Sequence, residues 1–245
     1  MKKERLYLLD TIRGILIIGV VVYHLLYDLN SIFGMNILWL NDWWADFIRD
    51  FGAGSFIFIS GMACHLSRNN TKRGIKAIVV ALIISIVTYV IIPEEFILFG
   101  IIHFLGICMI MYDSVGKYFN KLPLIFGSLM FLVFFILTYN VYYGYIGIKG
   151  FFEINLPSAL YGNVVGFIMG FGKGTNIYSA DYYPIFPWIF LFISGIIAGN
   201  YFEKDNVNKI FYKNYVPAIS WIGSKTMIIY ILHQPIMYGI LNIIF

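Results

Sequence analysis

Apolar stretches about as long as a bilayer is thick recur along this chain of 245 residues. A helix needs roughly 20 apolar residues to cross the hydrocarbon core. Hydrophobic residues make up 60% of the chain and charged residues only 12%, whereas a soluble domain carries about 25% charged residues. The sequence therefore predicts an all-α, polytopic membrane helix bundle that forms a single domain over residues 1–245.

About seven transmembrane helices are predicted, with polar segments between them. Pro93-Glu94-Glu95 ends the third stretch, and Glu203 to Asn206 follows the sixth. The first stretch lacks the short apolar core and the small-residue cleavage site of a signal peptide, so we expect it to be a retained span. The predicted spans are 8–27, 50–67, 74–92, 96–113, 121–139, 183–201 and 218–243.

Segment 156–172 is ambiguous, because it is apolar but rich in glycine. Lys and Arg accumulate on the cytoplasmic side of a membrane protein. With seven spans and the N-terminus inside, the outside keeps only Arg49, Lys149 and Lys173, so 140–182 is predicted to be an external segment. The inside receives the other basic residues: Lys2, Lys3, Arg5, Arg68, Lys72, Arg73, Lys76, Lys117, Lys121, Lys204, Lys209, Lys213 and Lys225.

Several ionisable residues fall inside the predicted spans, where they are costly and suggest function. At about 1.5 Å per helical residue, His24, His103 and His233 fall in one outer layer, while Asp10, Arg13 and His65 fall in the inner half. Taken singly, each histidine has a plain alternative as a hydrogen-bonding group between helices. Their common depth favours a shared functional site.

His24 has Asp28 four residues further on, on the same helical face. A carboxylate beside an imidazole fixes its tautomer and supports the cation that forms when the ring takes a proton. The pair is therefore a candidate general base, and a helix-end ion pair is the structural alternative.

Metal and disulfide chemistry are not expected. Cys64 and Cys108 both fall in apolar spans, there is no Cys-x-x-Cys motif, and the four histidines are far apart in sequence.

The order of short motifs resembles a known family. Leu9-Asp10-Thr11-Ile12-Arg13-Gly14 is followed by His24 and Asp28, and the last stretch carries Tyr230-Ile-Leu-His233-Gln234-Pro235. With Phe58-Ile-Ser-Gly61, Gly100-Ile-Ile-His103 and Ser179-Ala-Asp181-Tyr-Tyr183-Pro184-Ile-Phe-Pro187-Trp188 between them, the chain resembles the bacterial heparan-α-glucosaminide N-acetyltransferase-like membrane acyltransferases. It is also similar to the membrane O-acyltransferases of envelope glycans.

The resemblance implies acyl transfer from cytoplasmic acetyl-CoA, as co-substrate, to an amino or hydroxyl group of an extracytoplasmic sugar or glycan. It leaves open direct transfer or an acetyl-histidine intermediate. Arg13, Arg68, Lys72 and Arg73 are the predicted ligands of the CoA phosphates. His24, Asp28, His103 and His233 are the predicted catalytic residues, and the predicted substrate-binding residues are Asp181, Tyr183, Trp188 and Gln234.

Two other classes of function are weighed against acyl transfer. Intramembrane His and Asp also form proton relays in small-molecule or proton-coupled transporters, but the duplicated halves that many transporters show are absent from this sequence. A membrane scaffold is the third class. The expected partners are the lipid bilayer of the cell membrane, acetyl-CoA and the glycan acceptor, without nucleic acid, and a homodimer is left open.

Overall fold

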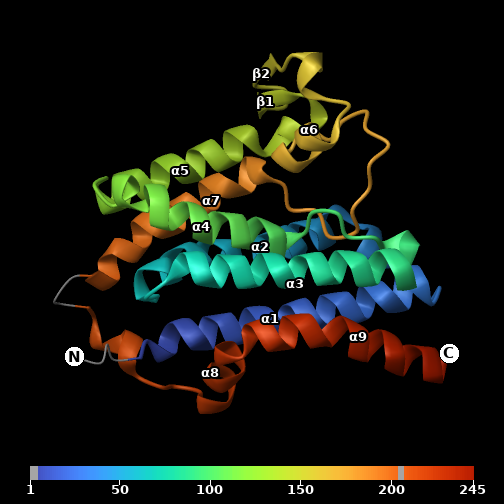
Figure 1. Cartoon of the computed structure of the whole chain (residues 1–245), viewed down its shortest axis with the longest axis horizontal. Coiled ribbons are helices and arrows are strands. Elements are labelled where there is room, and N and C mark those ends of the chain that lie inside the picture. Colours follow the sequence, from blue (N-terminus) through green and yellow to red (C-terminus); the bar gives the residue numbers. More distant parts are fainter. Residues whose placement is uncertain (1–4, 204–206) are drawn as a thin grey trace. The chain divides into compact units, whose positions relative to one another are not determined.

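The computed structural model of the chain describes residues 5–203 and 207–245 (Figure 1). Within those residues, six helical segments are long and apolar enough to cross a membrane, and Ile101–Gly116 is a shorter apolar helix. The prediction of an all-α membrane bundle with about seven spans is confirmed. The six longer segments are Tyr7–Ile32, Trp43–Leu66, Asn70–Ile91, Leu124–Tyr143, Ile185–Glu203 and Thr226–Ile244.

The helices and strands keep the predicted order but differ from it at several ends. The second helix begins at Trp43 rather than at 50, and the last predicted span is broken at Lys225, whose backbone is not helical. The elements are α1 (Tyr7–Tyr27), α2 (Trp43–Met62), α3 (Asn70–Ile91), α4 (Ile101–Phe119), α5 (Leu124–Thr138), β1 (Tyr145–Ile148), β2 (Phe152–Asn155), α6 (Val164–Met169), α7 (Ile185–Gly199), α8 (Pro217–Ser224) and α9 (Thr226–Ile244).

The chain divides into two compact units. The described residues of Met1–Ile59 and Asp205–Phe245 form unit 1, and those of Ser60–Lys204 form unit 2. Unit 1 contains α1, most of α2, α8 and α9; unit 2 contains the end of α2 and the elements from α3 to α7.

In unit 1, α1 packs against α8 and α9 (Figure 1). Glycines bring α1 and α8 together: a Cβ on Gly14 would meet the carbonyl oxygen of Ile219, and a Cβ on Gly223 would meet that of Asp10. Without a hydrophobic driving force between helices in lipid, small residues allow the close backbone approach on which packing depends. This contact fixes α8 against the N-terminal half of α1.

In unit 2, α3 packs against α4, and α5 packs against α7. Gly74 and Gly106 each lie against the backbone of the facing helix, so α3 and α4 also approach through small residues. Between α5 and α7, Phe131, Ile193 and Ile197 form a buried apolar cluster.

The outward face of α3 is apolar. Within a membrane such a face is solvated by lipid chains, which agrees with the low charge of the whole sequence. The exposed side chains include Ile75, Val79, Leu82, Ile83, Ile86, Val87 and Val90.

The segment 140–182 folds as a connection rather than as a span. β1 and β2 form an antiparallel hairpin in which Tyr145 pairs with Asn155. The six residues of α6 extend about 9 Å, far less than the roughly 30 Å of the hydrocarbon core. The Tyr182 hydroxyl donates to the Phe167 carbonyl at 2.6 Å, and burial raises the pKa of Tyr182, which keeps this donor protonated.

Some of the predicted inner charges fall outside the described residues, namely Lys2, Lys3 and Lys204, as do Asp205 and Asn206. The sidedness of the termini stays a prediction.

Candidate active site

Four of the predicted site residues come together in unit 1, where the end of α1 meets α9. His24 lies on α1, and Asp28 follows one turn later. His233 and Gln234 lie on α9. The imidazole rings of His24 and His233 have centroids 5.0 Å apart, and Gln234 Nε2 donates to Asp28 Oδ1 at 2.8 Å. We call these four residues the α1–α9 cluster.

Asp28 begins a π-helical turn, Asp28–Ile32, that continues α1. Such turns are rare and often occur at functional sites. The Asp28 side chain is fully buried. A buried carboxylate is costly unless it is hydrogen-bonded, and the Gln234 amide supplies one such bond. The local helix distortion and its partner on α9 therefore hold a polar group inside the unit.

His233 has a defined tautomer. Its Nδ1 lies 2.7 Å from the Tyr230 carbonyl oxygen, which can only accept, so Nδ1 carries the proton. In the neutral ring, Nε2 then carries a lone pair and is a hydrogen-bond acceptor.

Three buried polar atoms of the α1–α9 cluster lack a hydrogen-bond partner within the described part of the chain: Asp28 Oδ2, His233 Nε2 and Gln234 Oε1. Each such atom costs about 1–3 kcal/mol when it is left unpaired. All three are acceptors, because the Gln234 amide nitrogen already faces Asp28 and the His233 proton lies on Nδ1. The arrangement is suited to a ligand with several N–H or O–H donors.

The predicted pairing of Asp28 with His24 takes a different form. Both residues lie on one helical face, but among the residues that the structure describes no hydrogen bond joins them, and Asp28 is bonded to Gln234 instead. Gln234, which was predicted to bind substrate, is thus the group that orients the Asp28 carboxylate.

His103 belongs to unit 2, so the outer layer that it was predicted to share with His24 and His233 stays a prediction. Its Nδ1 accepts from the Gly100 N–H at 3.2 Å, which leaves the proton on Nε2, 3.4 Å from Ser85 Oγ. The ring stacks on Phe99. His103 therefore presents a weakly engaged donor rather than a free lone pair.

The other predicted substrate-binding residues also lie in unit 2. Asp181 Oδ2 accepts from the Ile101 N–H at 3.0 Å, at the first turn of α4, where a carboxylate also interacts favourably with the helix dipole. Tyr183 and Trp188 are buried, with ring centroids 5.0 Å apart, and Trp188 packs against Phe135. The sugar-binding role of these three residues stays a prediction.

The basic residues Arg68, Lys72 and Arg73 are exposed around the beginning of α3. Its first backbone N–H groups already have partners: the Lys72 N–H donates to Asn69 Oδ1, and the Thr71 N–H donates to Asp113 Oδ2, both at 2.7 Å. These two backbone N–H groups are therefore not available to a ligand, and phosphate binding by the basic side chains stays a prediction.

Arg13 lies in unit 1, in the N-terminal half of α1. Its Nη1 is 3.9 Å from Asp10 Oδ1, while Arg5 Nε donates to Asp10 Oδ2 at 2.7 Å. Asp10 thus lies between two guanidinium groups.

One polar group that was predicted for the inner half has a partner that the sequence did not suggest. The buried His65 places Nδ1 2.9 Å from Glu203 Oε1 and Nε2 2.8 Å from the Ile196 carbonyl. The two contacts join the end of the second span to that of the sixth, within unit 2.

Comparison with known proteins gives one match. Residues 5–235 match the model of the family described as heparan-alpha-glucosaminide N-acetyltransferase, catalytic. The matched range includes every residue discussed above as a candidate ligand or catalyst. No curated protein and no solved structure matches the chain.

Proposed function

Because the chain belongs to the heparan-alpha-glucosaminide N-acetyltransferase catalytic family, we propose that it transfers an acetyl group across the membrane. The donor is acetyl-CoA on the cytoplasmic side. The acceptor is an amino group of an extracytoplasmic sugar or glycan, and the reaction takes place at the α1–α9 cluster.

The observation that carries this proposal is the set of three unpartnered acceptors, Asp28 Oδ2, His233 Nε2 and Gln234 Oε1. A primary amine in its ammonium form offers three N–H donors and a positive charge, whereas a hydroxyl group offers one donor and no charge. The three acceptors of the cluster equal the three N–H donors of the ammonium group in number, and the negative charge of the Asp28 carboxylate complements its positive charge. This match favours N-acetylation over O-acetylation.

His24 is the proposed base. It has no hydrogen bond within the described residues, so its ring is free to turn toward the acceptor, and an imidazole is an efficient base near neutral pH. Proton transfer from the bound ammonium to His24 leaves the amine lone pair. The Asp28 carboxylate, on the same helical face, stabilises the charge of the His24 imidazolium.

The amine nitrogen then attacks the thioester carbon. A C–N bond forms, the C–S bond breaks, and the second nitrogen proton passes to the leaving CoA sulfur. Of the three groups predicted to stabilise the thioester oxygen, His233 and Gln234 have donors engaged with Tyr230 and Asp28. His103, whose Nε2–H lies 3.4 Å from Ser85 Oγ, belongs to unit 2, and its role as an oxyanion donor stays a prediction.

Acetyl-CoA binding is assigned to Arg68, Lys72 and Arg73 of unit 2, and the contribution of Arg13, which belongs to unit 1, stays a prediction. Guanidinium groups bind phosphate oxygens in pairs of hydrogen bonds, and the exposed side chains at the beginning of α3 are accessible to a ligand from the aqueous phase.

The test uses the purified protein in detergent with labelled acetyl-CoA and two acceptors of the same ring, glucosamine and glucose. We expect label on the glucosamine nitrogen and none on glucose. Equal labelling of both sugars would contradict the amine assignment, and absence of acetyl-CoA binding would favour the transporter alternative. Label on the protein in the absence of acceptor would indicate an acetyl-histidine intermediate.

A further inference from the structure

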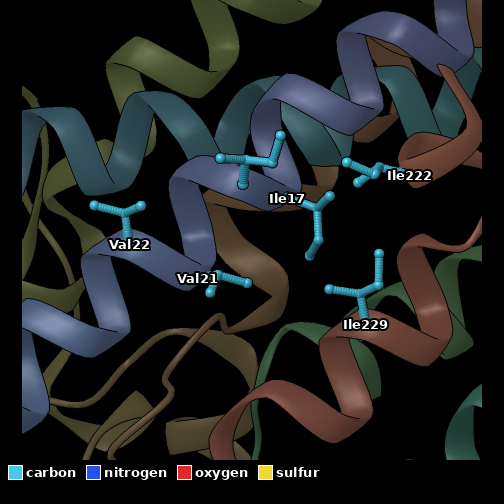
Figure 2. A pocket seen from close by; sticks show the side chains of 6 residues that line it. Ile17, Val21, Val22, Ile222 and Ile229 are labelled. Carbon is cyan, nitrogen blue, oxygen red and sulfur yellow. The ribbon is translucent and has the colours of Figure 1, made fainter. Parts of the chain in front are cut away.

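An apolar pocket of about 240 Å³ lies between α1, α8 and α9 in unit 1 (Figure 2). Its lining has no polar surface. Figure 2 shows Ile222 and Ile229 facing the α1 side chains across the pocket. A dry apolar cavity of about 150 Å³ already takes up benzene, so this pocket has room for an alkyl chain of several carbons. The lining residues are Ile17, Ile18, Val21, Val22, Ile222 and Ile229.

The pocket lies one helical turn from the α1–α9 cluster. Val21 precedes His24 by three residues on α1, and Ile229 precedes His233 by four on α9, so each pair shares a helical face. The rise between them is about 4.5–6 Å. A polar head with N–H donors and an apolar body are thus accommodated next to each other by the same two helices.

The pocket also opens sideways. Ile18 and Val22 are 40% and 49% exposed, and they belong to the middle of the membrane-spanning segment Tyr7–Ile32. A molecule in the bilayer can therefore enter without first passing through water, whereas a soluble sugar has no group that gains from an apolar wall.

From these observations we propose that the acceptor amine is carried by a membrane lipid, with its headgroup at the α1–α9 cluster and one alkyl chain in the pocket. The inference rests on the proposed function and names its acceptor class. The acceptor class is therefore that of glycolipids whose headgroup is an amino sugar.

The alkyl chain belongs to the acceptor rather than to the acyl donor. The cluster beside the pocket presents three acceptors, and a thioester carbonyl has no hydrogen to donate to them. The pantetheine arm of CoA carries amide groups, which a wall without polar surface leaves unpaired.

The experiment compares two acceptors with the same head, glucosamine and its octyl glycoside, using the protein in lipid nanodiscs with labelled acetyl-CoA. Burial of several CH₂ groups should make the KM of the octyl compound about tenfold lower or more. Val21→Phe and Ile229→Phe fill the pocket and should reduce the ratio of the two KM values about fivefold or more. Ile15→Phe, on an exposed part of α1 outside the pocket, controls for partition into the nanodisc and should keep the wild-type ratio.

A binding measurement accompanies the kinetics. An octyl glucosaminide with a photoreactive diazirine at the chain end should label the α1 and α9 peptides that contain Val21 and Ile229, and the variants Val21→Phe and Ile229→Phe should lose this label.

Equal labelling of all lipid-exposed helices, or a KM ratio that neither of these two variants changes, overturns the inference. Transfer to glucosamine with a KM ratio near one rejects the lipid acceptor and leaves the proposed function intact. Labelling of the pocket without any acetyl transfer rejects the proposed function and leaves the lipid site.

Discussion

Gln234 Nε2 donates a 2.8 Å hydrogen bond to Asp28 Oδ1, and this bond joins α9 to the end of α1 across 206 positions of sequence. It pairs one oxygen of a fully buried carboxylate and leaves the other oxygen for a ligand. The bond therefore stabilises unit 1, and it also orients the Asp28 carboxylate so that one of its oxygens can accept a hydrogen bond from a ligand.

Replacing Gln234 by Ala should destabilise the protein, because hydrogen bonds to charged groups contribute about 1.5–3 kcal/mol. The measurement is the thermal midpoint in detergent. Asn242→Ala is the matched control on the same helix, since the Asn242 amide donates only to the exposed Tyr238 carbonyl. An equal midpoint for the two variants would remove the assigned role from the Gln234 bond.

Glycine substitutions on α1 should separate packing from helix propensity. Gly14→Ala places a methyl group against the Ile219 backbone and should cost about 1–3 kcal/mol by overpacking. Gly19, on the same helix, has open space around it, so Gly19→Ala should be neutral or stabilising by about 0.5–1 kcal/mol. Thermal midpoints compare the two variants; similar shifts would show that α1 and α8 do not approach through Gly14.

The double variant Arg68→Ala with Arg73→Ala should weaken CoA binding about tenfold or more, because charge-assisted bonds to phosphate are lost. Both side chains are exposed, so folding should be unaffected. The control removes two lysines of unit 1 instead, Lys209→Ala with Lys213→Ala. CoA affinity is measured by calorimetry. If it is unchanged in the arginine double variant, the beginning of α3 does not bind the donor.

The charge distribution of the chain predicts which side of the membrane each end occupies. An odd number of spans places the termini on opposite sides, and the excess of Lys and Arg in the inner loops predicts the N-terminus inside and the C-terminus outside. Reporter tags at the two ends report the side of each. Two cytoplasmic tags would rule out seven spans.

The spans themselves could be predicted, because length and hydropathy alone decide whether a helix can cross a bilayer. The helix ends could not. The start of α4 depends on Asp181, which accepts from Ile101 N–H although it lies 80 positions away in sequence. The break at Lys225 lets α8 pack on α1 through Gly223, a contact that periodicity does not reveal.

The sequence predicted which residues make up the candidate site, but it did not predict the hydrogen bonds between them. The i, i+4 spacing brought His24 and Asp28 to one helical face, as expected, yet Asp28 is bonded to Gln234 from the distant α9. The tautomer of His233 depends on the Tyr230 carbonyl, and a backbone acceptor leaves no mark in a side-chain pattern. The His65–Glu203 pair was missed because its two side chains lie 138 positions apart in sequence, far beyond any local spacing.

The most direct test of the account is the rate of acetyl transfer to glucosamine by His24→Ala, with CoA affinity measured on the same sample. A general base typically contributes about 10²–10⁴-fold, so the variant should lose most of its turnover while it binds acetyl-CoA as the wild type does. Tyr23→Phe, at the neighbouring position, is the control and should stay active. A His24→Ala protein that transfers acetyl at near wild-type rate would contradict the assignment of the base to the α1–α9 cluster residue His24.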